Sequence, residues 1–528
     1  MCRLYYLLIG LFLMSSTSIF AQRVVTIEAN DDPLVVTDIF PIIMGDTTAT
    51  GERMDNNTIY ELENGSVYAT SGRLVNTPDW TLHIQAVDLE DTENKPIISR
   101  IPNDAGSFPD ILRSGGDLTL LNLWIISGEK GALEQHDWGK IRILGENSRV
   151  VVEDCIIEKD RGGFLQLRAD GVKMYVSNTI LRNGGNRRIL QGNGRGIDAR
   201  NFALDTLVMR DVIVHNIQDR FFRSQGGTSP HNYVEIDNCT SFNTIGRHGH
   251  IQLGRVRTAV ITNNLFVNPI MLGTSPFYTD EQTQPDNETH KVITIDTLYE
   301  DTELTIEANN IFWTEDVTSA WDAIDSVSMP GFLSDLIVEK LGEDGVADAY
   351  FSEEVMLSNV PQNITQYVID LYNNPMAEDM FDFIVEDVLV EGTAFDSDNL
   401  FDFSSFDACY SADAQSATAA TFGGAVGATA SCPAIVASAK EVVADAPDFT
   451  LSPNPLTAEG IFNYSLSNAG RVQLNIYSLD GQLMTTLLDE EQLAGDHNLT
   501  LSANLPSGMY IAVLKSAQSA RSLKMIVK

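Results

Sequence analysis

The segment Met174-Tyr-Val-Ser-Asn178-Thr-Ile-Leu181 alternates apolar and polar residues, reaches an asparagine, and then continues into a further apolar pair. Alternation with a period of two is typical of a β-strand that buries one face. The pattern recurs around six further positions, which are Asn122, Asp154, Asp211, Asn238, Asn263 and Asn309. Successive members of this series are 32, 24, 33, 27, 25 and 46 residues apart. The middle of the chain is therefore built from one repeated strand unit.

Intervals in the twenties, with loop insertions in the longer ones, predict one turn of a right-handed parallel β-helix per repeat. The chain must bend between two strands of each turn, and Asn or Asp tolerates left-handed backbone torsions there. Their side chains can also pair with the turn above. We therefore expect an all-β protein, with a parallel β-helix over residues 23–315 and a stacked Asn/Asp ladder within it.

The first 22 residues, MCRLYYLLIGLFLMSSTSIFAQ, predict a secretory signal peptide. Arg3 supplies the positive start, an apolar stretch follows, and small residues precede a cleavage-like Ala-Gln pair. No later run reaches the 18 apolar residues that a spanning helix needs. We expect an exported protein without a transmembrane helix.

Residues 447–528 contain short alternating strands separated by turn residues such as Asp480-Gly481, which predict a small C-terminal β-sandwich. Four segments in this region, SPNP (452–455), YSLDGQ (477–482), LPSGMYIAVL (505–514) and SLKMIVK (522–528), resemble the C-terminal sorting domain of the type IX secretion system of Bacteroidota. This resemblance implies handling by the type IX secretion machinery through residues 447–528. The protein would then be secreted or attached to the outer cell surface, with this domain removed.

Two regions connect the predicted β-helix to this domain. Residues 316–410 are acidic, with helical spacing at 332–341 and 364–372, and predict an elaboration or cap of the coil. Residues 411–446 are rich in Ala, Ser, Thr and Gly and predict a low-complexity chain end and linker.

The mature chain has four cysteines. Cys155 and Cys239 each follow a ladder position, which favours buried, inert thiols. Cys409 and Cys432 lie outside the repeats and can pair in an exported protein, but four cysteines allow three connectivities and the pairing stays open.

The stretch from residue 23 to 314 resembles secreted bacterial proteins of the pectate-lyase-like β-helix superfamily, and within it members associated with polysaccharide use. That superfamily includes lyases, hydrolases, esterases and proteins without known catalysis, so the resemblance leaves the activity open. Its lyases commonly use Arg or Lys as the base, often with calcium bridging the substrate carboxylate. Calcium is thus a cofactor implied by resemblance alone.

Charge is distributed unevenly along the chain. The whole protein has 34 Lys+Arg against 73 Asp+Glu, a net charge of −39. Residues 158–257 hold 15 Lys+Arg against 9 Asp+Glu, a net charge of +6, so the other 428 residues carry −45. The acidic total argues against nucleic acid, whereas the basic block indicates a polyanionic glycan as partner.

The repeat register places residues of one type above each other. Counting five positions on from Asn178, Asp211 and Asn238 gives three asparagines, and counting nine gives a row of arginines. We expect these residues to line a groove for an acidic polysaccharide, although such residues can also lie in solvated turns. The predicted substrate-binding residues are Asn183, Asn216, Asn243, Arg187, Arg188 and Phe221. The predicted catalytic residues are Arg220, Arg223, Arg247, His248 and His250.

Two functions remain open from the sequence. The first is binding of an acidic polysaccharide with cleavage by β-elimination, which needs a base, a neutralised carboxylate and a proton donor. The second is a non-catalytic carbohydrate-binding or adhesive surface protein. Hydrolysis is less favoured, since it requires paired carboxylates and Asp198, Asp211 and Asp219 are scattered. Stacked arginines repel unless a counter-charge lies between them, and Asp219 is the candidate for that counter-charge.

Overall fold

The computed structural model describes most of the chain in two compact units, residues 1–436 and 437–528. The described residues are 22–30, 35–101, 110–126, 141–160, 162–185, 194–246, 248–274, 290–324, 327–357, 360, 364–373, 408–429, 432, 449–452, 454, 456, 460–466, 470–478, 483–493, 495–501, 505–506, 508–515 and 520–527. The predicted signal peptide, apart from Gln22, lies outside them.

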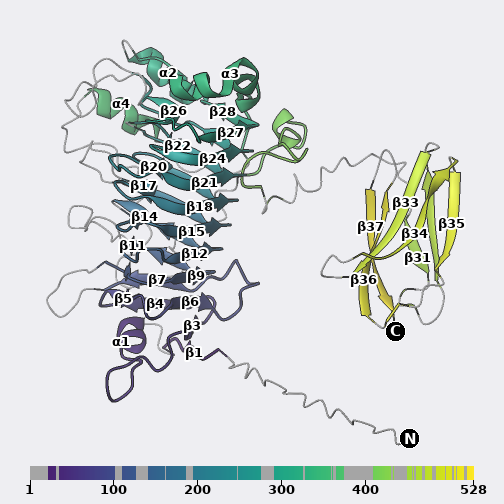
Figure 1. Cartoon of the computed structure of the whole chain (residues 1–528), viewed down its shortest axis with the longest axis horizontal. Helices are drawn as coiled ribbons and strands as arrows, with labels where there is room; N and C mark the ends of the chain where they lie inside the picture. The colour runs from purple at the N-terminus through teal and green to yellow at the C-terminus, as the bar shows by residue number, and fades with distance from the viewer. Residues whose placement is uncertain are drawn as a thin grey trace, which may run out of the picture. The chain divides into compact units, whose positions relative to one another are not determined.

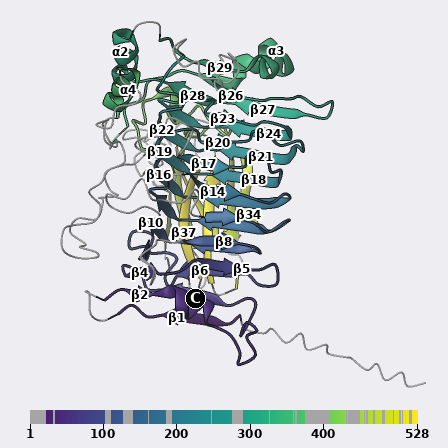
Figure 2. The ribbon, with the colours of Figure 1, turned by 90° about the vertical axis from the view of Figure 1, so that its left-hand side faces the viewer.

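The first unit is a parallel β-helix, in which strands of successive turns stack to form three parallel sheets that run along the coil (Figure 1, Figure 2). The first sheet contains β1 (Val24–Ile27), β3 (Ile59–Leu62), β6 (Leu82–Ala86), β9 (Leu118–Leu121), β12 (Arg149–Glu153), β15 (Val172–Ser177), β18 (Leu204–Arg210), β21 (His231–Asp237), β24 (Val256–Thr262) and β27 (Glu303–Glu307). The second sheet contains β2 (Thr37–Asp38), β4 (Val67–Thr70), β7 (Ile97–Arg100), β10 (Trp124–Ile126), β13 (Ile156–Glu158), β16 (Ile180–Gly184), β19 (Ile213–Ile217), β22 (Thr240–Thr244), β25 (Leu265–Val267), β28 (Asn309–Phe312) and β30 (Tyr350–Phe351). The third sheet contains β5 (Leu74–Asn76), β8 (Leu112–Ser114), β11 (Ile141–Ile143), β14 (Gly163–Leu167), β17 (Arg195–Asp198), β20 (Phe222–Arg223), β23 (Ile251–Gln252), β26 (Lys291–Thr294) and β29 (Gly331–Leu333).

The core of the coil is formed by alternate side chains from every strand. On β15, Val172, Met174 and Val176 are buried, while Lys173 between them is exposed. Met174 pairs in register with Leu207 of β18, so the apolar positions of successive turns lie directly above each other. The predicted all-β parallel coil is therefore confirmed. The alternation that the sequence shows supplies the buried side chains that pack its strands together.

The bend between the first and second sheets is made by one residue with a positive φ in each of the seven turns from β9 to β27. Asn122, Asp154, Asn178, Asp211, Asn238 and Asn263 have φ between 45° and 58°, as the ladder prediction requires. The seventh position was assigned one residue too late. Ala308, with φ of 55°, makes the bend, and Asn309 instead points inward and accepts a hydrogen bond from Asn264 Nδ2 at 2.8 Å.

A second ladder closes the other end of the second-sheet strands. Asn183, Asn216, Asn243 and Asn268 have φ between 51° and 59°. Asn243 Nδ2 donates to Asn216 Oδ1 at 3.2 Å, and Asn268 Nδ2 donates to Asn243 Oδ1 at 3.0 Å. These asparagines fix a turn by the same physical means as the first ladder.

Helices lie at both ends of the coil (Figure 1). The helix α1 (Ile39–Met44) packs Ile39 and Ile43 onto the first turns. At the other end lie α2 (Glu315–Ala323), α3 (Asp335–Ala349) and α4 (Thr365–Asn373). The predicted end of the coil at residue 315 is too early, because β29 and β30 still add to two of its sheets. The first residues of the predicted helical stretch 332–341 accordingly belong to β29.

The Ala/Ser/Thr/Gly-rich stretch after residue 408 is not a free linker along its described length. A disulfide joins Cys409 to Cys432, which settles the open pairing, whereas Cys155 and Cys239 are buried thiols as expected. We call residues 408–429 and Cys432 the cover segment. It includes a short 3₁₀ turn, Gln415–Ala417, and packs its alanines and Tyr410 against the outer face of the second sheet.

The small side chains of the cover segment allow its backbone to approach the ladder. Gly427 donates to the Asn263 carbonyl at 2.7 Å, and Ala428 donates to Thr240 Oγ1 at 2.9 Å. A Cβ on Gly427 would lie 2.7 Å from both Thr240 Oγ1 and Leu265 Cβ, and its φ of 88° also favours glycine. The low-complexity composition is thus required by close packing.

The second unit contains two antiparallel sheets, of three and four strands. Its strands are β31 (Thr450–Ser452), β32 (Gly460–Leu466), β33 (Gly470–Ser478), β34 (Leu483–Gln492), β35 (Gly495–Leu501), β36 (Gly508–Lys515) and β37 (Ala520–Val527). Phe462, Leu474, Ile476, Ala512 and Met525 are fully buried in a common core. The predicted small C-terminal β-domain is confirmed, while its Asp480-Gly481 turn lies outside the described residues.

Replacement of Ala308 by Asn should stabilise the first unit. A β-carbon in left-handed conformation costs about 1–2 kcal/mol, and Asn tolerates that conformation better than Ala. We expect the free energy of unfolding to rise by about 1 kcal/mol in a denaturant titration. The matched change Asn263→Ala should lower it by at least as much, because the Asn263 amide also donates to Asp237 Oδ1 at 2.7 Å. A destabilised Ala308→Asn variant would contradict the assignment of the bend.

Removal of the disulfide should loosen the cover segment. The bond spans 23 residues of sequence separation, and closure of a loop of this size contributes about 3 kcal/mol. We expect the double change Cys409→Ser/Cys432→Ser to lower the unfolding free energy by about that amount. A reducing agent should have the same effect on the wild type and none on the variant. Equal sensitivity of both proteins to reduction would argue against this bond.

Candidate functional site

The outer face of the third sheet carries a continuous polar column. Strand alternation points Leu112, Ile141 and Leu165 inward, so that the residues following them point outward. In-register pairing then aligns, from turn to turn, Arg113, Arg142, Gln166, Asp198, Arg223 and Gln252. The sequence predicted a row formed by Arg187, Arg220 and Arg247, whereas the structure places two other cations, Arg113 and Arg142, directly beside each other.

A buried carboxylate stabilises the first group of arginines. The Asp110 side chain is fully buried, and its Oδ2 lies 2.7 Å from Arg113 Nη2, 3.4 Å from Arg73 Nε and 3.7 Å from Arg142 Nη1. The repulsion between neighbouring guanidinium groups is thereby offset by one shared counter-charge.

Two further buried carboxylates hold the second group. Asp198 lies 3.2 Å from Arg195 Nη1, 3.4 Å from Arg200 Nη2 and 3.8 Å from Arg223 Nη1. Asp219 Oδ2 lies 2.9 Å from the Nε atoms of both Arg195 and Arg220. The expected role of Asp219 as a counter-charge is therefore confirmed for Arg220.

We call this set of cations the arginine face. It comprises Arg73, Arg113, Arg142, Arg168, Arg195, Arg200, Arg220 and Arg223, which belong to or adjoin β5, β8, β11, β14, β17 and β20. Six strands at the usual spacing span about 24 Å along the coil. Among the residues that the structure describes, seven of these guanidinium groups share the carboxylates Asp110, Asp198 and Asp219, and Arg168 adds an eighth positive charge. The positive charges of the face therefore outnumber these carboxylates.

Burial sets the protonation of the groups in this face. Burial would raise the pKa of the Asp219 carboxyl, but Arg220, the hydrogen bond with His248 and Arg195 together hold that pKa well below its usual range. Burial, together with the neighbouring Arg195 and Arg220, lowers the pKa of Arg223 to about 8. Burial and Arg220 likewise lower the pKa of His248 to about 4, so its ring is neutral at pH 7 and meets Asp219 Oδ1 through Nδ1 at 3.1 Å.

The predicted catalytic residues are distributed over different environments. Arg220, Arg223 and His248 come together around Asp219 and Asp198. His250 is instead fully buried, with its ring 5.0 Å from that of Phe266 and 5.7 Å from that of Phe221. Phe221 is also fully buried, and its ring packs against those of His250 and Phe266, so the structure places both predicted site residues in the apolar core. Arg187, Arg188 and Arg247 lie outside the described residues.

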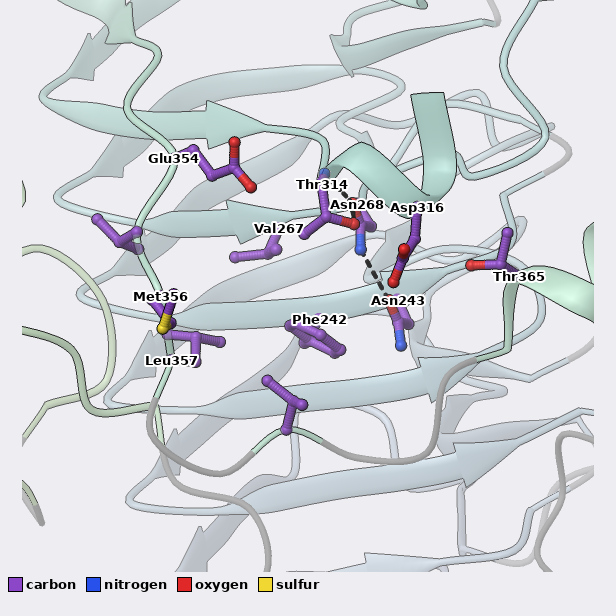
Figure 3. A pocket seen from close by; sticks show the side chains of 12 residues that line it. Phe242, Asn243, Val267, Asn268, Thr314, Asp316, Glu354, Met356, Leu357 and Thr365 are labelled. Carbon is purple, nitrogen blue, oxygen red and sulfur yellow. Dashed lines mark hydrogen bonds between the residues drawn. The ribbon is translucent and has the colours of Figure 1, made fainter. Parts of the chain in front are cut away.

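The predicted substrate-binding asparagines Asn183, Asn216 and Asn243 form the second ladder and are almost fully buried. Asn243 borders a pocket of about 420 Å³ on the outer side of the second sheet, whose lining does not include Asn183 or Asn216 (Figure 3). Its apolar wall includes Phe242 and Val267, and its carboxylates are Asp316 and Glu354. This acidic pocket differs in chemistry from the arginine face and suits no polyanion.

The sequence missed the arginines of the lower turns. Arg73, Arg113 and Arg142 precede the basic block of residues 158–257, and Arg142 lies on a strand that lacks the Asn/Asp marker. The alternation Leu112-Arg113-Ser114 and Ile141-Arg142-Ile143 was the available indication, since a charged residue between two buried ones must point outward.

No group of three or more His, Cys, Asp or Glu side chains is arranged to hold a metal ion among the described residues. The calcium that the superfamily resemblance implies therefore has no identified carboxylate cluster in that part of the chain. The three carboxylates of the arginine face are each already engaged by guanidinium groups.

Comparison with known proteins identifies the second unit. Residues 450–528 match the family of the secretion system C-terminal sorting domain, as their sequence motifs predicted. This domain marks proteins for type IX secretion, so the protein is exported to the cell surface or the extracellular space. No curated protein matches the chain. Within the described residues, no helix has both the length and the apolar character needed to cross a membrane.

Acid should destabilise the β-helix because its buried histidines are held neutral. Burial lowers the pKa of His231 to about 4 and that of His250 to about 3. A histidine in the unfolded chain binds a proton below about pH 6.5, whereas these buried histidines stay unprotonated in the folded chain. Proton binding below that pH therefore favours the unfolded state. Stability is therefore present above pH 6.5 and is lost as the pH falls.

Between pH 7 and pH 5 we expect a loss of roughly 2 kcal/mol in unfolding free energy from each of these two histidines. Asp198 and Asp219, whose pKa values are lowered, add a loss in the same direction at still lower pH. The variant His250→Phe should lose about 2 kcal/mol less than wild type over this range in denaturant titrations. Parallel pH profiles of the two proteins would contradict a neutral buried His250.

Proposed function

We propose that this exported β-helix protein binds an acidic polysaccharide along the arginine face. The observation that carries the proposal is that, in the described part of the chain, seven arginines along one sheet share three buried carboxylates. Arginine is the residue best suited to bind carboxylate or sulfate groups through paired hydrogen bonds. A linear polyanion lying along the coil would meet such groups turn after turn.

The partial exposure of the face supports this use. The side chains of Arg73, Arg113 and Arg200 are 31%, 29% and 34% exposed, although each contacts a buried carboxylate. The buried carboxylates thus orient the guanidinium groups, while part of each arginine side chain remains exposed to solvent. Such orientation reduces the entropy lost when a ligand is bound.

The negative charge of the rest of the chain restricts where a polyanion can bind. A protein of net charge −39 repels a polyanion over most of its surface. The arginine face is a local exception, so an acidic chain would be directed to it. Binding of this kind weakens as salt concentration rises, because charges exposed to solvent are screened.

The second candidate function is cleavage of the bound chain by β-elimination, and it rests on Arg223 and His248. With a pKa of about 8, Arg223 can exist without its proton at mildly alkaline pH and act as a base. His248 is oriented by Asp219 and keeps 17% of its side chain exposed. Arg223 would return the proton taken from the sugar carbon to the leaving oxygen, so that the bond to the leaving sugar breaks as the carbon–carbon double bond forms.

The double change Arg142→Gln/Arg168→Gln tests binding. It removes two charges from the face while leaving the Arg113–Asp110 pair in place. We expect the affinity of the full-length protein for polygalacturonate, alginate or a sulfated glycan to fall by about 10-fold or more, since hydrogen bonds to charged groups contribute about 1.5–3 kcal/mol each. Calorimetry at two salt concentrations measures the loss of affinity and how far salt screens the remaining binding.

The matched control is Arg149→Gln/Lys173→Gln, which removes two charges from neighbouring, in-register positions on the first sheet. This variant should bind as the wild type does. Equal loss in both variants would indicate a nonspecific charge effect and defeat the proposal. The same incubations are followed by ultraviolet absorbance for unsaturated products, and binding without product would exclude the elimination function.

A further inference from the structure

The second group of the arginine face holds more buried positive than negative charge. Arg195, Arg220 and Arg223 are all at least nine-tenths buried, and the two carboxylates that face them are Asp198 and Asp219. His248 is neutral at pH 7 and adds no charge. Within the described residues, three buried guanidinium groups contact two carboxylates, which leaves one positive charge without a counter-charge. Burial of an unpaired charge is strongly unfavourable.

The same arginines have donors without acceptors. Within the described part of the chain, Arg223 Nε and Nη1 and Arg220 Nη2 are buried and have no hydrogen-bond partner. The nearest carboxylate oxygen to Arg223 Nη1 is Asp198 Oδ1 at 3.8 Å, which is too far for a hydrogen bond. Buried polar groups in proteins are almost always paired, so these donors indicate a missing acceptor.

The two guanidinium groups lie at the same level of the coil. Arg220 Nη1 donates to Gln252 Oε1, and Gln252 is the in-register neighbour of Arg223 on the next strand of the third sheet. Arg223 Nη2 is already used by Gln225 Oε1 at 3.0 Å. The unused donors are therefore the Nε and Nη1 of Arg223 and the Nη2 of Arg220.

We propose that Arg220 and Arg223 form a subsite for one oxyanion, a carboxylate or sulfate group carried by the acidic polysaccharide. The inference rests on the proposed function for the source of that group, and the subsite itself rests on the unpaired donors. The oxyanion supplies the missing negative charge and accepts from Arg223 Nε and Nη1 and from Arg220 Nη2. The low pKa of Arg223 has the same origin, namely burial beside other cations without a full counter-charge.

The test uses the full-length protein with two small probes, glucuronate and inorganic sulfate. Thermal unfolding and calorimetry at pH 7 measure binding of each probe. We expect one probe to bind and to raise the melting temperature, which identifies the group as carboxylate or sulfate. The change Arg223→Gln should weaken its binding by 10-fold or more, and Arg223→Lys should weaken it too, because lysine keeps the charge but loses the paired donors. Lys173→Gln, on the first sheet, should leave binding unchanged.

A second variant keeps the test decisive if Arg223→Gln fails to fold. Gln252→Glu places a carboxylate beside Arg220 Nη1, in register with Arg223. It should raise the melting temperature without any probe and abolish the response to the probe. A lower melting temperature together with a retained response would overturn the subsite, as would an absence of response to both probes in the wild type.

The outcomes for the subsite and for the proposed function are distinguishable. If polysaccharides bind equally well to wild type and Arg223→Gln, the subsite is wrong and the arginine face remains. If a probe binds in an Arg223-dependent way but no polysaccharide binds, the proposed function is wrong and a site for a single anion remains.

Discussion

The structure depends on one backbone constraint, the single left-handed residue that follows each first-sheet strand from β9 to β27. Asn178 or Asp211 can take a positive φ there at small free-energy cost, and the next strand starts two residues later in the second sheet. Because the bend uses one residue in each of these turns, they keep their register. A slip of one residue would turn every buried side chain outward.

Register is what converts a scattered sequence into a surface. Arg113, Arg142 and Arg223 are far apart in the chain, yet each follows an inward-pointing residue of the third sheet and so falls into one outer column. Their proximity would be unfavourable without Asp110 and Asp198, which are buried and acceptor-only. The positive charges of this column thus lie beside buried carboxylates that stabilise them.

The outer face of the second sheet is treated differently. Small residues of the cover segment lie against it, and Gly427 and Ala428 form hydrogen bonds with Asn263 and Thr240. Larger side chains would prevent this approach. The disulfide from Cys409 to Cys432 holds the segment at its two ends. Part of one outer face is therefore covered by packing, whereas another remains partly open and charged.

The sequence by itself determined the local features: the repeat, the bend at positions such as Asn178, the alternation, the sorting motifs and the buried thiols. These follow from short-range backbone preference and strand periodicity, which neighbouring residues fix. It assigned the bend of the seventh turn to Asn309 rather than Ala308, since inward and bending positions differ by one residue. It also took the asparagines of the second ladder for ligands.

Only the tertiary structure decided which polar residues face solvent. His250 and Arg220 lie two and three residues before in-register strand positions of the third sheet, and packing buries both, one among phenylalanine rings and one beside Asp219. Their roles depend on which turns lie above and below, and on side chains brought in from distant segments. Burial and counter-charge are properties of that assembled environment, so no local pattern in the sequence can specify them.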